Sequence, residues 1–486
     1  MKLGLVYPYN CDGDPPVGLA SIATYLREYL HFNGTRIIDV NFEDPLEVVR
    51  RWKPDVVGIS AMTGSYGESI RTARAIKQEF DIPIVIGGVH LSTLPTSLHD
   101  VFDFGVVGEG EQTALELMQL YEKEGGFPAQ KLRKIPGLVV HKNKGVAFTG
   151  TRSLITPLDI IPSPDRKFTN KAYYKPRLIF WGEESYGRRD SILTARGCPY
   201  RCTFCSTSKF WQTIRFHSPE HVAREIKMLV EDYRIDHISV LDDLFTCNKK
   251  RIVDITRMLE EEGILDKVTF GCMARANVIN SELCGLLKRL NVKNLNFGFE
   301  SGSDRVLASL KKDGVTVEKI KKAVDVCKKH AIHVSGSFIF GSPGETLRDM
   351  EQTVDLIQWM AKAGVDRVWT FVMTPYPGTE VWDIAKKRGK VSDDMDWERV
   401  GNQLYDVDNP SLLDDSIDKG EFKNVWMKAN AELEKMSNPQ RRLSRLRMRI
   451  RHEPVKTIKQ VVYNPVNSIS FLGKVAQSVM RGTRHG

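Results

Sequence analysis

Short apolar runs alternate with amphipathic stretches along most of this chain of 486 residues, and the alternation constrains the fold more than any other feature. Within residues 1–125 each apolar run is followed by a stretch with helical periodicity. This order predicts βαβ units around a parallel, doubly wound sheet. The predicted strands of this first series are residues 2–8, 35–40, 55–60, 83–88 and 103–108.

A second series of the same kind begins at Ser191. Its predicted strands are residues 191–195, 237–241, 269–274, 293–299, 333–340 and 367–373. Helices are predicted between them, at residues 220–233, 249–262, 317–330 and 346–363. Six consecutive parallel βα units predict a partial (β/α)6 barrel, which is shorter than the closed form of eight units and carries its chemistry at the carboxyl ends of the strands.

These patterns divide the chain into four parts. Residues 1–150 are predicted to form a Rossmann-like or flavodoxin-like domain that ends in a hairpin at 135–148. Residues 151–190 contain four prolines and are predicted to be an irregular linker. The barrel is expected at 191–385. Residues 386–486 are expected to form a helical region, with a helix at 419–436, that ends in a basic tail.

The net charge of +9 belongs to that tail. From Asn438 onward the chain has eleven basic residues and one acidic residue, whereas the rest is near neutral. A nucleic-acid partner is therefore not expected. Leu443, Leu446 and Ile450 recur at helical spacing between arginines, so the tail is either a peripheral contact with an anionic membrane or a solvated segment.

Cellular location follows from what the sequence lacks. No apolar window approaches the ~18 residues of a membrane span, and the N-terminus has no signal-peptide pattern. Eight cysteines in so long a chain are too few for a disulfide framework. These features predict a cytoplasmic protein, with membrane-peripheral contact through the tail as an option.

Three of the cysteines lie close together, directly after the first strand of the second series. Cys198, Cys202 and Cys205 form a Cys-x3-Cys-x2-Cys run whose thiolates can converge on one metal centre. A structural zinc site usually has four protein ligands, and the nearest further cysteine, Cys247, lies a whole βα unit away. Three thiolates therefore favour an iron–sulfur cluster with one open iron over zinc or inert buried thiols.

This loop resembles that of the radical S-adenosylmethionine (SAM) enzymes, in which three cysteines after the first barrel strand hold a [4Fe–4S] cluster. The resemblance implies that SAM binds the open iron and is cleaved to a 5′-deoxyadenosyl radical. Other motifs follow in the family's order, each at a predicted strand end. The residues expected at the cluster-bound SAM are Phe204, Asp242, Arg275, Glu300, Ser301 and Gly341.

Two of these residues also have a simpler interpretation. Asp242 belongs to an acidic pair that could cap the start of a helix. Arg275 ends an apolar strand, where an arginine needs an anionic partner, and either the SAM carboxylate or an internal aspartate would serve.

Four glycine-rich loops are predicted at one edge of the N-terminal sheet, where glycine allows the backbone to approach a ligand closely. They resemble the cobalamin-binding domain of cobalamin-dependent radical SAM enzymes. The residues expected at cobalamin are Pro16, Gly18, Ser60, Met62, Thr63, Gly87, Gly88, His90, Gly108, Glu109, Gly110 and Glu111. The cobalt-ligating motif Asp-x-His-x-x-Gly of other cobalamin proteins is absent, so His90 is either a cobalt ligand or a cap of its loop.

The resemblance implies a cobalamin-dependent radical SAM enzyme that modifies, and most commonly C-methylates, an unactivated carbon. The substrate is expected to be a small molecule, a lipid or isoprenoid or a natural product, and the reductant a protein such as flavodoxin or ferredoxin. Three alternatives stay open. They are a ring-closing, oxidising or C–C coupling enzyme with an empty cobalamin-like domain, a tRNA methylthiotransferase, and a non-catalytic cobalamin-sensing module. Methylthiotransferases carry further N-terminal cysteines, whereas here only Cys11 precedes Cys198.

Overall fold

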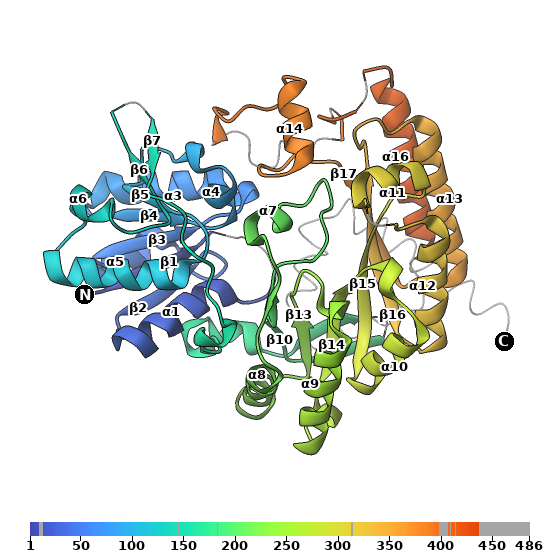
Figure 1. The fold of residues 1–486 in the computed structure, drawn as a ribbon, viewed down its shortest axis with the longest axis horizontal. Coiled ribbons are helices and arrows are strands. Elements are labelled where there is room, and N and C mark those ends of the chain that lie inside the picture. The colour runs from blue at the N-terminus through green and yellow to red at the C-terminus, as the bar shows by residue number, and fades with distance from the viewer. Residues whose placement is uncertain are drawn as a thin grey trace, which may run out of the picture.

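Two parallel sheets organise the chain into two α/β bodies that lie side by side (Figure 1). The computed structural model describes residues 1–436, apart from residues 9–12, 144, 182, 313, 398–406, 409 and 414. The predicted basic tail and Cys11 therefore lie outside the described residues. None of the described helices is long and apolar enough to cross a membrane.

The N-terminal body is built on seven strands in the order β2-β1-β3-β4-β5-β6-β7. Five of them are parallel: β1 (Leu3–Tyr7), β2 (Thr35–Asp39), β3 (Val56–Ser60), β4 (Ile84–Gly87) and β5 (Phe104–Val106). β6 (Leu138–His141) and β7 (Val146–Phe148) add an antiparallel hairpin at one edge. The structure thus confirms the five predicted strands and the hairpin, with ends that differ by one or two residues.

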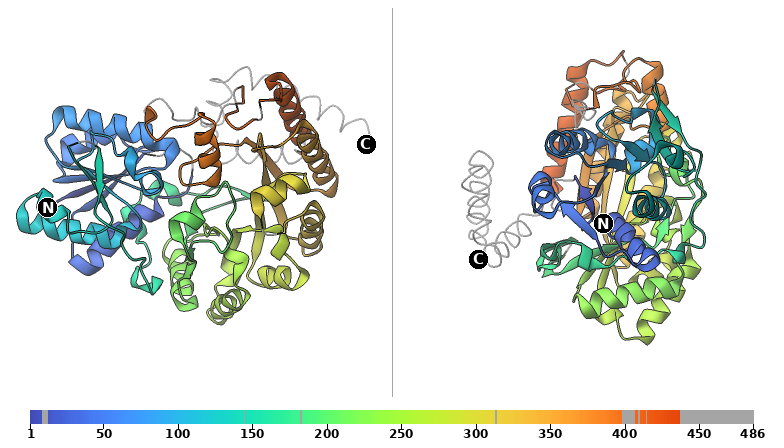
Figure 2. Two further views of the ribbon diagram at one scale, coloured as in Figure 1. Left: turned by 45° about the horizontal axis from the view of Figure 1, so that its top comes forward. Right: turned by 90° about the vertical axis from the view of Figure 1, so that its left-hand side faces the viewer.

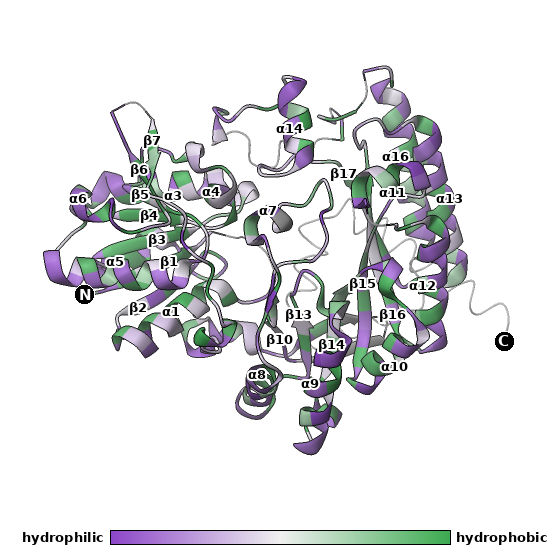
Figure 3. Cartoon of the chain, viewed as in Figure 1, coloured by the Kyte–Doolittle hydropathy of each residue, from purple (hydrophilic) through white to green (hydrophobic). Residues whose placement is uncertain are grey.

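Helices cover both faces of this sheet. Because successive side chains of a strand point to opposite faces, β1 contributes to two cores. Leu3 and Leu5 pack with α1 (Val17–Leu30) and α5 (Gly110–Glu124), whereas Val6 packs with α2 (Pro45–Trp52) and α3 (Tyr66–Glu79). The strands are accordingly apolar between helices whose polar residues face outward (Figure 3). Two shorter helices complete this body, α4 (Val89–Thr93) and α6 (Ala129–Leu132).

The second body is a sheet of six strands in the order β10-β13-β14-β15-β16-β17, and every neighbouring pair is parallel. The strands are β10 (Arg189–Ile192), β13 (His237–Val240), β14 (Thr269–Ala274), β15 (Val292–Glu300), β16 (His333–Phe340) and β17 (Arg367–Val372). Among the described strands, β10 and β17 are the two ends and do not pair with each other. The barrel is therefore partial, as predicted.

Helices surround the outer face of this partial barrel (Figure 2). They are α8 (Pro219–Asp232), α9 (Lys249–Glu261), α10 (Ser281–Arg289), α11 (Asp304–Lys311), α12 (Val317–Lys329), α13 (Leu347–Ala363) and α16 (Lys419–Met436). α14 (Glu380–Lys387) instead lies between the two bodies and packs against the core of the N-terminal body (Figure 1). Local sequence sets their starts, because Ser218 caps α8 ahead of a proline and Thr346 forms a capping box with Asp349 at α13. α16 packs along α13 beside β17 and has the predicted bounds of 419–436.

The structure differs from the sequence prediction around the first barrel strand. The predicted strand 191–195 is displaced, because β10 ends at Ile192 and the chain then forms a short ribbon of β11 (Ala195–Arg196) and β12 (Arg215–Phe216). The loop between them contains α7 (Thr207–Trp211). Strands of two residues are too short to show alternation in a sequence, so this ribbon was not predicted.

The predicted linker is more ordered than an irregular segment. It contains three 3-10 helices, Leu158–Ile160, Arg166–Phe168 and Lys171–Tyr174, and the hairpin of β8 (Arg177–Trp181) and β9 (Glu183–Gly187). Arg166 anchors it, being fully buried and ion-paired with Asp190 at 2.9 Å and with Glu225 at 2.8 Å. Arg166 also donates to the backbone oxygen of Ser191 at 2.7 Å, which ties the linker to β10.

This anchor predicts a large effect of Arg166→Ala on stability. The substitution leaves the carboxylates of Asp190 and Glu225 buried without their cation, which costs on the order of 3 kcal/mol or more. We expect a clearly lower midpoint of unfolding in urea, followed by circular dichroism. The control is Arg257→Ala, which removes an exposed ion pair with Glu261 and should leave the midpoint nearly unchanged. Equal midpoints for the two variants would contradict the prediction.

Candidate functional site

The loop that carries the three cysteines begins with a sharp bend. Gly197 has a φ of +100°, and a Cβ at this position would collide with the backbone oxygen of Thr213. A second contact fixes the far part of the loop, because the Thr203 amide donates to the Leu310 backbone oxygen at 2.9 Å. The cysteines are therefore held between the β11–β12 ribbon and α11.

Cys198, Cys202 and Cys205 are all half-buried thiols of this loop. Burial raises the pKa of Cys198 to about 11 and also raises that of Cys205, so their thiolates need a bound cation for stabilisation. Among the described residues, the three sulfur atoms do not all lie within 4.8 Å of one another. A tetrahedral zinc ion would need sulfur atoms roughly 3.8 Å apart. The sulfur atoms are therefore not arranged around a single zinc ion in the structure.

Arg275 lies against the cysteine loop. Its Nη1 is 3.2 Å from the Cys202 Sγ, its guanidinium stacks 3.9 Å from the ring centroid of Tyr200, and its Nη2 donates to the Lys311 backbone oxygen at 3.0 Å. Sequence analysis expected this arginine at the SAM carboxylate or at an internal acid. The structure places it beside a cysteine sulfur, and contact with SAM stays a prediction.

Glu300 and Ser301 follow the fourth barrel strand as predicted, but they face different surroundings. Glu300 has a φ of +64° at a bulge of β15, and it is buried in an ion pair with Lys311 at 3.0 Å. A non-glycine residue in this conformation is costly, which is typical of a functional site. The Ser301 hydroxyl is fully buried and bonds to Thr353 and to the Ser303 amide. Ser301 thus stabilises its own loop instead of facing a ligand.

The Asp242 side chain also lies in the protein interior. It is fully buried and accepts hydrogen bonds from the amides of Thr194 at 2.6 Å and Ala195 at 3.0 Å, so it holds the segment that leads to the cysteines. Burial raises its pKa to about 6. In the structure these backbone amides are the partners of Asp242, and a cofactor contact stays a prediction. Its neighbour Asp243 lines the cavity described below and accepts a hydrogen bond from Thr207 at 3.1 Å.

Phe204 and Gly341 were the remaining residues expected at SAM. Phe204 is half-buried, and the Nζ of Lys311 lies 5.9 Å from its ring centroid. Gly341 has a φ of +78°, and a Cβ there would come within 3.3 Å of the Phe422 ring on α16. Phe204 therefore lies within the cysteine loop. At Gly341, α16 covers the position that a side chain would take.

A cavity of about 370 Å³ separates the two bodies. The N-terminal body lines it with β3, β4 and β5 and the loops that follow them, and also with residues of β1, α1 and α5. The barrel lines it with Leu193, Ala195, Arg196, Phe210, Trp211, Leu241 and Asp243. Eight of the residues expected at cobalamin line it, namely Gly18, Ser60, Gly87, Gly88, Gly108, Glu109, Gly110 and Glu111. Gly18 and Gly108 leave open space where a Cβ would lie, so the wall fits a large ligand that approaches the backbone closely.

Four of the residues expected at cobalamin do not line this cavity. Pro16 precedes α1 and accepts the Ala20 amide through its backbone, and the Met62 side chain is 48% exposed beyond β3. Thr63 and His90 are buried and bond to each other at 3.1 Å. The structure therefore does not place these four residues at the cavity, and their contact with cobalamin stays a prediction.

His90 is a core residue in the described structure. Its second ring nitrogen is 3.1 Å from the Ser97 hydroxyl, and the rings of Tyr66 and Trp397 pack against it at 4.1 and 4.5 Å. Burial lowers its pKa to about 3, so the ring is neutral. With both nitrogens engaged by hydroxyl groups, His90 caps its loop and is not placed to bind cobalt.

An ion network joins the two bodies at the cavity wall. Arg196 pairs with Glu109 and with Glu111, both at 2.5 Å, and Arg215 pairs with Glu109 at 3.0 Å. Burial acts to raise the pKa of Glu111, but the Arg196 charge outweighs it and holds the pKa below its ordinary value. Trp211 lies over both arginines, with cation–ring distances of 5.6 and 5.4 Å.

The two glutamates were predicted at the cofactor, whereas their arginine partners were not predicted. The available signal was the position of Arg196, which immediately precedes Gly197 and the first cysteine. Lys311 was missed as well, because nothing in the sequence shows that it approaches the site, whereas Asp243 belongs to the acidic pair noted after the second barrel strand.

Comparisons with known proteins agree with this geometry. A family model described as the radical SAM superfamily matches residues 192–357, and a model of the B12 binding domain matches residues 14–118. An uncharacterised methyltransferase of Pyrococcus horikoshii is 33% identical over 381 residues, which cover 76% of this chain and 78% of the relative. The hopanoid C-3 methylase of Methylococcus capsulatus is 26% identical, with coverage of 77% and 69%.

A solved structure shows the same fold. It is the radical SAM methyltransferase TsrM of Kitasatospora setae with cobalamin and a [4Fe–4S] cluster bound, with a TM-score of 0.67, 19% identity and coverage of 90% of each chain. The matching domains, their order and the similarity to the Pyrococcus methyltransferase lead to one conclusion. The chain belongs to the radical SAM enzymes that carry an N-terminal B12-binding domain.

Proposed function

We propose that this protein transfers a methyl group to an unactivated carbon atom of a small-molecule substrate. The observation that carries the proposal is the shared cavity, whose walls come from the glycine loops of the B12-binding body and from the segment that leads into the cysteine loop. A methyl donor on one wall and a hydrogen-abstracting radical on the other must reach the same substrate atom, and a common chamber allows this.

Within this proposal Cys198, Cys202 and Cys205 hold the cluster and leave one iron for SAM. When bound, the cluster with SAM supplies a 5′-deoxyadenosyl radical and cobalamin supplies a methyl group. Arg275 would hold Cys202 in place through its contact with the sulfur at 3.2 Å. The pair of Glu300 and Lys311 provides buried charges near the cysteine loop for the polar end of SAM.

The glycine loops would hold cobalamin on the opposite wall. Gly87 ends β4 and Gly88 follows it, and Gly108 follows β5 with a φ of +87° and open space on its side-chain face. A broad, flat ligand can therefore contact the backbone of several loops at once. Leu241 and Trp211 would cover it from the barrel side and exclude water.

Apolar side chains at the carboxyl end of the barrel favour an apolar substrate, such as a lipid, an isoprenoid or a natural product. Leu241 follows β13 and is 43% exposed, and Phe371 and Tyr376 at the end of β17 are 45% and 46% exposed. Apolar side chains exposed at these strand ends would contact an apolar substrate in the proposed reaction. The hopanoid methylase among the relatives is in line with this substrate class.

Two further parts of the proposal concern partners. Reductive cleavage of SAM needs an electron, for which we propose a small protein donor such as flavodoxin or ferredoxin. The arginine-rich segment 441–451, which lies outside the described residues, is proposed to contact anionic membranes peripherally.

Cys202→Ser tests the cluster assignment. We expect the variant purified without oxygen to lose most of its roughly four irons per chain and to form no 5′-deoxyadenosine, because serine is a poor iron ligand. Bound cobalamin should be unchanged, since its wall is formed by the other body. Cys247→Ser is the matched control, a half-buried cysteine outside the motif that should keep its iron. Full iron content in Cys202→Ser would refute the assignment.

Glu111→Gln tests whether the ion network positions cobalamin. The substitution removes one of the two carboxylates that hold Arg196 at the cavity wall, and we expect cobalamin affinity to fall on the order of 10-fold with iron content unchanged. Glu116→Gln on the same helix is the control, because Glu116 pairs with Arg152 and does not line the cavity. Cobalt and iron per chain are measured together, and an equal effect of both variants would argue against the role.

A further inference from the structure

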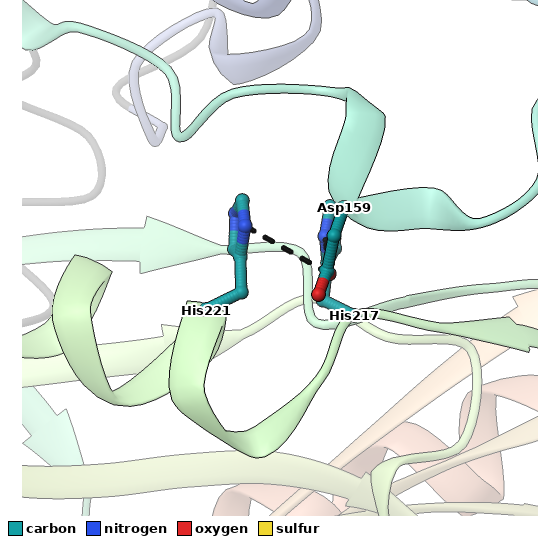
Figure 4. A group of neighbouring side chains, drawn as sticks. All are labelled: Asp159, His217 and His221. Carbon is teal, nitrogen blue, oxygen red and sulfur yellow. Dashed lines mark hydrogen bonds and ion pairs between the residues drawn. The ribbon is translucent and has the colours of Figure 1, made fainter.

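Three side chains converge at a point that the proposed function does not use. Asp159 comes from a 3-10 helix of the linker, His217 follows β12, and His221 lies in the first turn of α8 (Figure 4). One ligand atom from each lies within 4.8 Å of the other two. Within the described residues, no other group of three His, Cys, Asp or Glu side chains gathers this closely.

The two distances from Asp159 to the histidines bracket the value expected around a single metal ion, although the shorter one is also a hydrogen bond. The Asp159 Oδ1 is 3.0 Å from the His217 Nδ1 and 3.8 Å from the His221 Nδ1. Bonds of about 2.0–2.1 Å in tetrahedral geometry place zinc ligand atoms roughly 3.3 Å apart, a value between these two distances. The longer distance exceeds hydrogen-bond range, so hydrogen bonding to the carboxylate does not explain why the His221 nitrogen faces it.

A further contact orients one of the histidines for metal binding. The His221 Nε2 is 3.1 Å from the Ser163 hydroxyl, which is a second residue of the linker. When the ring donates through Nε2, its Nδ1 carries the lone pair that faces Asp159. Ligating histidines commonly use the second nitrogen in this way, because the hydrogen bond fixes both the tautomer and the ring orientation.

Burial favours the neutral form of both rings. His217 and His221 are 7% and 5% exposed and stack with centroids 4.2 Å apart. Burial, together with the like charge of its neighbour, lowers the pKa of His217 to about 4, and burial lowers that of His221. Two neutral imidazoles and one carboxylate form a donor set that zinc accepts, and the more exposed Asp159 leaves room for water as a further ligand.

We propose that Asp159, His217 and His221 form a binding site for a divalent transition metal ion, with zinc as the best fit. The ion would clamp the linker to the β11–β12 ribbon. The His217 amide donates to the Thr194 backbone oxygen at 3.0 Å, and Arg251 donates to the backbone oxygens of His217 and Thr194 at 3.1 and 2.7 Å. The site is independent of the proposed methyl transfer.

Zinc alone is the probe, added to the full-length enzyme with its iron–sulfur cluster in place. We expect one equivalent of zinc to remain after dialysis and to raise the temperature of unfolding. X-ray absorption at the zinc edge should show nitrogen and oxygen neighbours at about 2.0–2.1 Å, whereas zinc held by cysteines would show sulfur at about 2.3 Å. This element-specific readout separates the site from the cysteine loop.

Conservative variants test the three side chains. His221→Gln and Asp159→Asn should each weaken zinc binding well over 10-fold, and Ser163→Ala about 10-fold by releasing the ring. Asp159→Asn keeps an oxygen for the Ser218 amide, which donates to Asp159 at 2.9 Å, so the start of α8 stays capped. His330→Gln, a histidine bonded to Ser281 on the barrel, is the control and should bind zinc normally.

The proposal fails if the cluster-loaded enzyme takes up no zinc. It also fails if bound zinc shows a sulfur shell, or if His221→Gln and Asp159→Asn bind zinc as tightly as the unaltered protein. Cobalamin content, iron content and 5′-deoxyadenosine formation are measured in the same samples and report separately on the proposed function.

Discussion

The buried contact of Arg196 with Glu109 and Glu111 fixes how the two bodies meet. The two guanidinium nitrogens of Arg196 each contact one carboxylate at 2.5 Å. A guanidinium suits this arrangement because it is planar and offers donors in fixed directions. Burying such charges costs free energy that their attraction scarcely recovers, so the network contributes little net stability. The network instead acts on geometry. If one body were misplaced, buried charges would lose their partners, and this cost in free energy favours one arrangement of the cavity walls.

The regular parts of the fold were predictable because they repeat. All five parallel strands of the first sheet, the six units of the partial barrel and α16 follow from periodic patterns in the sequence. The glycine loops were predictable for a related reason, since parallel strands place their carboxyl ends at one edge. Gly18, Gly87 and Gly108 accordingly line the cavity. The ribbon of β11 and β12 was missed because two-residue strands have no detectable period.

Side-chain direction was the part that the sequence did not reveal. Asp242 and Asp243 are neighbours after the same strand, yet one binds the backbone of Thr194 and the other faces the cavity. His90 likewise sits beside the glycine loop but turns into a core formed with Trp397, more than three hundred positions away in the chain. Such choices depend on partners that are distant in sequence, and a single sequence does not show which partners meet.

The linker is held in place by such partners, which are distant in sequence. It contacts the N-terminal body where the Ile155 amide donates to Glu109 at 2.7 Å and the Tyr173 hydroxyl donates to Asp39 at 2.6 Å. It contacts the barrel through Arg166 and through Asp159 beside His217. A segment held on both sides cannot act as a free hinge, because motion of one body would break buried contacts with the other. Chemistry that needs two cofactors at a set separation benefits from this restraint, since even a small misplacement of reacting groups slows a reaction strongly.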